Sequence, residues 1–97
     1  MQRRNTQSIG EVLRDFFEDN TEIYEKIMNI RIKHAWTDTL GPVINHYTTN
    51  LYVEDRVLYV SLSSSVLRNE LMLTKNKLIA SLNKYAGATV INDIVIR

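Results

Sequence analysis

The spacing of apolar residues changes twice along the chain, and this change decides the fold class. Apolar residues recur at helical spacing up to about residue 40, alternate with polar residues between 49 and 62, and return to helical spacing after 65. A helix and a half-buried strand need these two different periods. Since 97 residues form one domain, the pattern predicts a single α+β domain in which helices cover a small sheet.

The N-terminal third predicts two helices. Ser8 and Glu11 form a capping box, and the first helix extends from Ser8 to about Asp19, with Ile9, Val12, Leu13, Phe16 and Phe17 at helical spacing. The second helix begins near Thr21 and carries a stripe of Ile23, Ile27 and Ile30, which His34 continues. It should end at Gly41-Pro42, because glycine accepts a left-handed cap and proline does not continue a helix. We expect His34 to be partly buried.

A hairpin is predicted from Thr49 to Leu62, with Glu54-Asp55-Arg56 at its turn. The alternation places one set of apolar side chains towards the helices, namely Leu51, Val53, Leu58, Val60 and Leu62. Tyr52 and Tyr59 then lie on the opposite face.

The stretch from Ser63-Ser64-Ser65 to Gly87 predicts a third helix whose phase is inconsistent. Five side chains share a narrow arc, namely Leu67, Leu71, Leu78, Leu82 and Tyr85. Val66 and Leu73 point away from that arc, so either the helix is buried on two sides or it breaks. We expect a bend or break within two residues of Thr74.

Thr89 to Arg97 predicts a third strand. Ile94 and Ile96 share one face with Val90, whereas Ile91 and Val95 share the other. Because both faces are apolar, we expect this strand not to be a lone exposed edge. The core should contain Phe16, Ile27, Trp36, Leu51, Val60, Leu71, Leu78, Leu82 and Ile94.

Composition excludes several classes of chemistry. The absence of cysteine excludes disulfides, thiolate catalysis and cysteine-ligated metal sites. His34 and His46 are twelve residues apart without further ligands nearby, so we expect no metal. No Gly-rich phosphate loop and no nucleophile with a partnered base occurs, and we therefore expect neither a cofactor nor an enzyme. No secretion signal or membrane span is encoded, so the expected location is the cytoplasm.

Charge is distributed unevenly although the net charge is only +1. Residues 1–10 carry two basic side chains, residues 11–25 carry six acidic against one basic, and residues 26–97 carry nine basic against five acidic. Their net charges are therefore +2, −5 and +4. Such asymmetry is compatible with a polyanionic partner, but solvated helix faces also produce it.

An ordered set of residues resembles a known bacterial family. The set comprises Ile32, Ala35-Trp36, Gly41, Thr48 or Thr49, Leu51, Asp55, Leu58, Val60, Ser64-Ser65, Glu70-Leu71, Lys75, Leu78, Leu82-Asn83, Gly87, Asp93-Ile94 and Arg97. It is similar to the domain family of unknown function that includes DciA, a loader of the replicative helicase, and the similarity extends from Ser8 to Arg97. Asp55-Arg56 stands where many members have Asp-Gly in the hairpin turn, so a turn type different from theirs is expected. Leu67 stands where many members have tryptophan.

The resemblance implies a KH-like two-layer sandwich, binding to the replicative helicase, and contact with single-stranded or forked DNA. KH modules grip RNA through a Gly-x-x-Gly loop between two helices. The corresponding stretch here, from Leu73 to Lys77, contains no glycine. A KH-like fold alone therefore does not imply that this chain binds RNA through such a loop.

These considerations predict a flexible basic N-terminus at residues 1–7, followed by one domain at 8–97. The candidate nucleic-acid-binding residues are its basic side chains, namely Arg3, Arg4, Arg31, Lys33, Arg68, Lys75 and Lys77. Within this set, Lys75, Lys77 and Arg31 are expected to face phosphates. The alternative is a protein-interaction domain without a nucleic-acid role, which uses the hairpin tyrosines or the acidic first helix.

Overall fold

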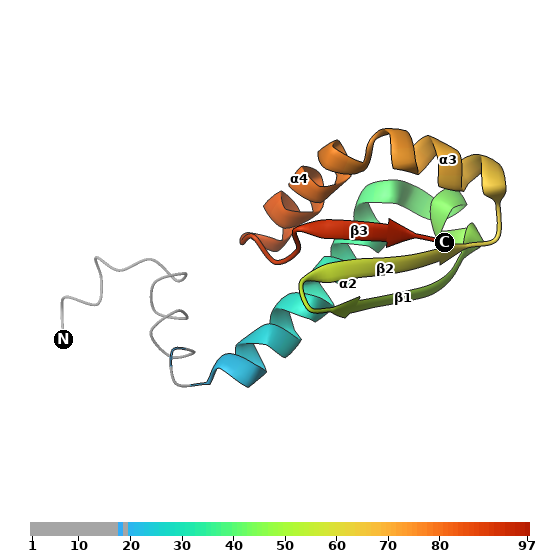
Figure 1. The fold of residues 1–97 in the computed structure, drawn as a ribbon. Helices are drawn as coiled ribbons and strands as arrows, with labels where there is room; N and C mark the ends of the chain where they lie inside the picture. Colours follow the sequence, from blue (N-terminus) through green and yellow to red (C-terminus); the bar gives the residue numbers. More distant parts are fainter. Residues whose placement is uncertain (1–17, 19) are drawn as a thin grey trace.

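A computed structural model describes residue 18 and residues 20–97, which form an α+β domain (Figure 1). Its elements are α2 (Thr21–Tyr47), β1 (Thr48–Glu54), β2 (Val57–Leu62), α3 (Ser65–Leu73), α4 (Lys75–Ala86) and β3 (Asp93–Ile96). The predicted α+β class is confirmed. Three predictions concern residues outside the described range. They are the flexible N-terminus at residues 1–7 with Arg3 and Arg4, the burial of Phe16, and the helix from Ser8 to about Asp19, apart from residue 18.

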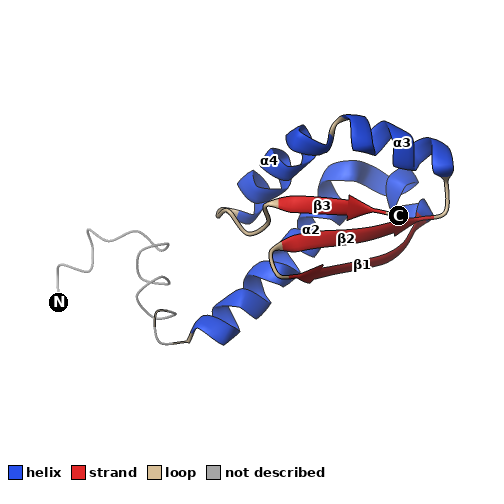
Figure 2. Cartoon of the chain, in the orientation of Figure 1, coloured by secondary structure: helices blue, strands red, loops and turns tan. Residues whose placement is uncertain are grey.

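The sheet has the order β1-β2-β3, with β1 and β2 antiparallel and β2 and β3 parallel. Tyr52 pairs with Tyr59 across the hairpin, and Leu51 pairs with Val60. This register confirms the predicted hairpin and its two faces. Figure 2 shows the helices gathered on one side of the strands, so the sheet has an inner face on the core and an outer face.

The hairpin turn keeps the backbone of a glycine-containing turn although it has no glycine. Asp55 and Arg56 have φ values of 51° and 66°. Positive φ at both central residues is the signature of a type I′ turn, so the expectation of a different turn type is wrong. The Arg56 guanidinium donates a hydrogen bond to the Thr89 carbonyl at 3.1 Å, and the Arg56 carbonyl accepts one from the Asn92 amide at 2.9 Å. These contacts hold the turn where glycine is absent.

The core lies between the inner face of the sheet and helices α2 and α4. Its buried members are Ile32, Ala35, Trp36, Leu58, Val60, Leu62, Leu78, Leu82, Ala86, Ile91 and Ile94. Burial is confirmed for five predicted core residues, namely Trp36, Val60, Leu78, Leu82 and Ile94, while Leu51 and Leu71 pack against the cluster partly buried.

The predicted phase of α2 is wrong. Ile27 is exposed, as are Ile23, Ile30 and His34, whereas Ile32, Ala35 and Trp36 are buried. At 100° per residue these two sets lie on opposite sides of the helix. The isoleucine stripe precedes the part of α2 that the sheet covers, so its regular spacing identified the wrong face.

The helix breaks at Gly41-Pro42, where it was expected to end, and a second helical segment follows within α2. The backbone breaks at Gly41, which has φ 85° and ψ 177°, but helical structure resumes with Pro42 and lasts to Tyr47. Proline is well suited to a first helical position because it needs no amide partner there. The Asn45 side-chain amide donates to the Thr37 carbonyl at 2.8 Å, which satisfies an acceptor near the break.

Substituting the two left-handed glycines tests these backbone assignments. Gly41 lies in a region that essentially only glycine adopts, whereas Gly87, at φ 83° and ψ 11°, has the ordinary left-handed cap conformation. We expect Gly41→Ala to lower the free energy of unfolding by about 1–3 kcal/mol and Gly87→Ala to cost about 1 kcal/mol. Urea denaturation of both variants measures this difference. Equal stability of Gly41→Ala and the parent would contradict the assignment.

The predicted break in the third helical stretch is confirmed. α3 ends at Leu73, Thr74 forms a turn, and α4 begins at Lys75. Val66 and Leu73 are 69% and 82% exposed. The inconsistent phase therefore reflects two separate helices, and no second layer among the described residues covers the Val66–Leu73 side.

The C-terminal strand is shorter than predicted and lies at an edge. β3 covers only Asp93–Ile96 and pairs with β2 alone, so it is an edge strand of the sheet, although its four residues are buried or half-buried. Residues 89–92 form a loop, which the Asn83 side chain holds through hydrogen bonds with the Val90 and Ile91 amides and the Ile91 carbonyl. Ile91 is buried from this loop, which explains why the apolar pattern began before the strand.

Candidate nucleic-acid interface

The outer face of the sheet carries an aromatic and cationic cluster. Alternation along β1, β2 and β3 turns Tyr52, Tyr59 and Val95 away from the core, because their neighbours Leu58, Val60 and Ile94 are buried. The two tyrosines and Val95 occupy one cross-strand row and are half-buried. No helix of the described part of the chain is packed on this face (Figure 2).

Arg97 joins the two tyrosines into one unit. The Tyr52 and Tyr59 rings stack with centroids 4.8 Å apart and planes 9° apart. The Arg97 guanidinium lies 5.2 Å from the Tyr59 ring centroid and donates a hydrogen bond to the Tyr52 hydroxyl at 3.0 Å. A cation over an aromatic ring is attracted to the π-face. We call Tyr52, Tyr59 and Arg97 the Tyr-Arg platform.

A second arginine lies at the same end of the sheet. The Leu62 amide donates to the Arg97 carbonyl at 2.8 Å, and the Leu62 carbonyl accepts from the Arg68 guanidinium at 2.7 Å. Arg68, a predicted site residue, is therefore half-buried and engaged with the backbone that also holds Arg97. Its charge contributes to this end of the sheet while its guanidinium fixes the start of α3 to the end of β2.

Sequence reasoning missed Arg97 although a usable signal was present. Val95 was assigned to the face opposite Ile94 and Ile96, and one further step of two residues reaches Arg97. The tyrosines had been assigned to the outer face of the hairpin. Only the position of β3 beside β2 brings Arg97 to them, and this pairing of residues distant in sequence is not visible in the alternation itself.

Lys75 is engaged in a salt bridge. Its Nζ lies 2.9 Å from an Asp93 carboxylate oxygen, so α4 and β3 are joined at their N-terminal ends. This hydrogen bond from Lys75, together with the Ile94 amide, lowers the pKa of the Asp93 carboxyl below its usual 3.8. The lysine therefore offers less free charge to a phosphate than sequence alone indicates.

The salt bridge gives a pH-dependent prediction. Because the folded-state pKa of Asp93 is depressed, its contribution to stability is present above pH 3.8 and is lost as the pH falls through the folded-state pKa. We expect Asp93→Asn to be less stable than the parent at neutral pH and equal to it in strong acid. Thermal unfolding from pH 7 down to pH 2 measures this convergence; a difference that stays constant with pH would contradict it.

The remaining predicted basic residues are spread over two helices. Arg31 lies near Tyr85. The hydrogen bond to Asp38 is the main cause that raises the pKa of Tyr85, and the positive charge of Arg31 acts to lower it. Lys77 is exposed in the first turn of α4, eight residues before Tyr85 and therefore ~12 Å away along the helix. Lys33 is half-buried on α2. The described contacts do not join these three cations.

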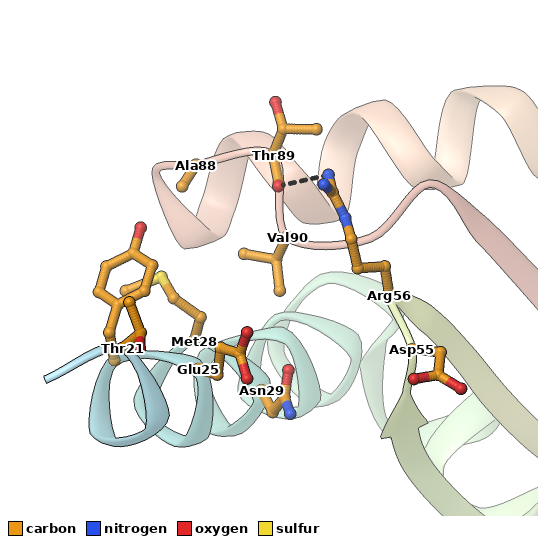
Figure 3. Close-up of a pocket in the computed structure, with 10 residues that line it drawn as sticks. Thr21, Glu25, Met28, Asn29, Asp55, Arg56, Ala88, Thr89 and Val90 are labelled. Atoms are coloured by element: carbon orange, nitrogen blue, oxygen red, sulfur yellow. Dashed lines mark hydrogen bonds between the residues drawn. The ribbon is translucent and has the colours of Figure 1, made fainter. Parts of the chain in front are cut away.

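A cavity of about 480 Å³ lies away from the platform, between the start of α2, the hairpin turn and the loop after α4 (Figure 3). Tyr24, Met28 and Val90 line it with apolar surface. Arg56, its basic lining residue, is hydrogen-bonded to the Thr89 carbonyl, and the other charged lining residues are Glu25 and Asp55. Two carboxylates repel phosphates, so this cavity is a poorer place for a nucleic-acid backbone than the platform.

Two further features are absent from the described part of the chain. Residue 18 and residues 20–97 contain no group of three or more His, Asp or Glu side chains placed to hold a metal ion. Within the same residues, no helix combines the length and the apolar content that crossing a membrane requires.

Comparison with known proteins gives one family. The model of the family described as "Dna[CI] antecedent, DciA" matches residues 8–96. No curated protein matches the sequence significantly. The matched region includes every described element and both tyrosines of the platform.

Proposed function

Because the chain belongs to the DciA family, which implies a role in loading the helicase of DNA replication, we propose that it contacts single-stranded or forked DNA while it helps to recruit the replicative helicase. The family is not a known enzyme family, and in this proposal the domain acts in the bacterial cytoplasm without catalysis. We further propose that the domain is KH-like, with a glycine-free junction at Thr74 between α3 and α4.

The observation that favours DNA contact is the Tyr-Arg platform. Proteins that bind single strands combine aromatic rings, on which bases stack, with cations that attract the phosphate backbone. Arg97 and the two tyrosines unite both properties on an open sheet face. In this proposal bases stack against the platform, and phosphates approach the end of the sheet where Arg97 and Arg68 lie. Arg31, Lys75 and Lys77 contact further phosphates, and Arg3, Arg4 and Lys33 add longer-range attraction.

Salt dependence tests DNA contact and separates it from the alternative. Fluorescence anisotropy with a labelled single-stranded oligonucleotide should show binding that weakens as salt increases. The logarithm of the binding constant should fall with the logarithm of the salt concentration, with a slope of about −0.7 per phosphate neutralised. For three contacts by Arg31, Lys75 and Lys77 the slope is roughly −2. Replacing these three by Glu should abolish binding. Arg31 and Lys77 are exposed, and their charges contribute little stability. Lys75→Glu also removes the salt bridge to Asp93, so circular dichroism checks that the variant is folded.

The outcomes distinguish the two functions. No wild-type binding at low salt would favour the pure protein-interaction function, in which Tyr52 and Tyr59 contact a protein. Wild-type binding that the triple variant retains unchanged would remove those three cations from the interface and leave the platform as its remaining candidate.

A further inference from the structure

An exposed row of isoleucines lies on the side of α2 that faces away from the core. Ile23, Ile27 and Ile30 are 51%, 37% and 50% exposed, although they are spaced one helical turn apart. Figure 1 shows the first turns of α2 extending beyond the sheet. Single exposed apolar residues are ordinary, whereas a contiguous row marks an interaction surface. We call these three residues the α2 stripe.

The α2 stripe has a basic border. Lys26, Arg31 and Lys33 each lie three or four residues from an isoleucine of the stripe, which makes them its neighbours on the helix surface. Within residues 18 and 20–97, the one salt bridge joins Lys75 to Asp93. Lys26, Arg31 and Lys33 therefore have no ion-pair partner among these residues. Glu22 and Glu25 lie on the same turns of α2, but neither is three or four residues from an isoleucine of the stripe.

We infer that the α2 stripe docks an amphipathic helix of a protein partner, and that the apolar row of this helix is bordered by Asp or Glu. A row at helical spacing fits the ridges of a second helix, and the border selects opposite charge. A DNA backbone would form ion pairs with the basic border but leave the isoleucine side chains exposed to water. The inference rests on the proposed function, because the replicative helicase is the protein expected to carry the acidic helix.

The position of the stripe allows DNA and the partner to bind together. Ile32, Ala35 and Trp36 face the core from the other side of α2, and the sheet lies beyond them. The Tyr-Arg platform is on the far side of that sheet. The core therefore separates the platform from the stripe, so bases on the platform do not obstruct a partner on the stripe. Arg31 and Lys33, which border the stripe, are the cations that the two ligands would share.

The test is the double variant Ile23→Asp, Ile27→Asp in the full chain, with Val66→Asp as the control because Val66 is an exposed apolar residue of α3. Affinity for the purified replicative helicase of the same bacterium is measured by biolayer interferometry. We expect the double variant to bind at least ~10-fold more weakly, since loss of an anchor side chain at the centre of an interface weakens binding by this factor or more. Val66→Asp should bind like the parent. Lys26→Glu with Lys33→Glu should also weaken binding, chiefly through a slower association rate.

Two further readouts identify other occupants of the stripe. A lower melting temperature of the double variant would mean that the chain itself covers the stripe, and a change from dimer to monomer in light scattering would mean that a second copy does; either result would overturn the inference. Undiminished helicase binding by the double variant would overturn it while leaving the proposed function intact. No helicase binding by the parent would overturn the proposed partnership and the inference together.

Discussion

Replacing Trp36 by Ala should cost about 3–5 kcal/mol of unfolding free energy, the largest effect of any single substitution considered. Trp36 is fully buried where α2 meets the hairpin. Its indole N–H donates to the Thr48 hydroxyl at 3.2 Å, and that hydroxyl donates to the Ile44 carbonyl at 2.7 Å. The substitution therefore opens a cavity and removes one member of a short hydrogen-bond chain across the Gly41 break. Urea denaturation followed by circular dichroism measures the loss.

Two other variants calibrate this result. Trp36→Phe keeps most of the ring but loses the N–H donor, so it should cost about 1–2 kcal/mol. Leu78→Ala removes a buried aliphatic side chain of α4 and should cost roughly 2–5 kcal/mol. If the free energy of unfolding of Trp36→Ala lay within 1 kcal/mol of the parent's, the packing of α2 on the sheet would be wrong.

The second large effect should appear in DNA affinity. Stacking of one base on an aromatic side chain contributes about 1–3 kcal/mol, and we therefore expect Tyr52→Ala and Tyr59→Ala each to weaken single-strand binding by roughly 5- to 150-fold. Tyr52 and Tyr59 stack on each other, so the loss in the double variant should be smaller than the sum of the two. Fluorescence anisotropy at fixed salt measures all three.

Tyr85→Ala is the matched control, since Tyr85 is an exposed tyrosine of α4 that contacts Asp38 rather than the platform. It should bind DNA like the parent. Tyr52→Phe should also retain most of the affinity, because the ring remains and only the hydroxyl that accepts from Arg97 is lost. Equal losses in the Tyr85 and Tyr52 variants would show that the platform has no special role.

The strands and their faces were predictable because alternation reports burial directly. The hairpin, the outward tyrosines and the break at Thr74 all follow from local periodicity, which nearby residues determine. The phase of α2 was not predictable in the same way. Ile23, Ile27 and Ile30 form a regular row, but a row shows only that a helix has an apolar side, not that the domain itself covers this side.

Long-range features also escaped prediction. The parallel pairing of β3 with β2 depends on how α3 and α4 return the chain to the sheet, and no local pattern encodes this. Arg97 joined the candidate site for that reason. Likewise, Lys75 and Arg68 were expected to be free cations, whereas a carboxylate and a carbonyl from other elements engage them.

An NMR titration with a short single-stranded oligonucleotide tests the central claim most directly. The claim is that the outer sheet face contacts DNA. Backbone amides of Tyr52, Tyr59, Val95 and Arg97 should shift progressively on titration, while those of Ile23 and Ile27 on the opposite side of the core should not. Shifts confined to α2 and α4, or the absence of any shift at low salt, would contradict the claim.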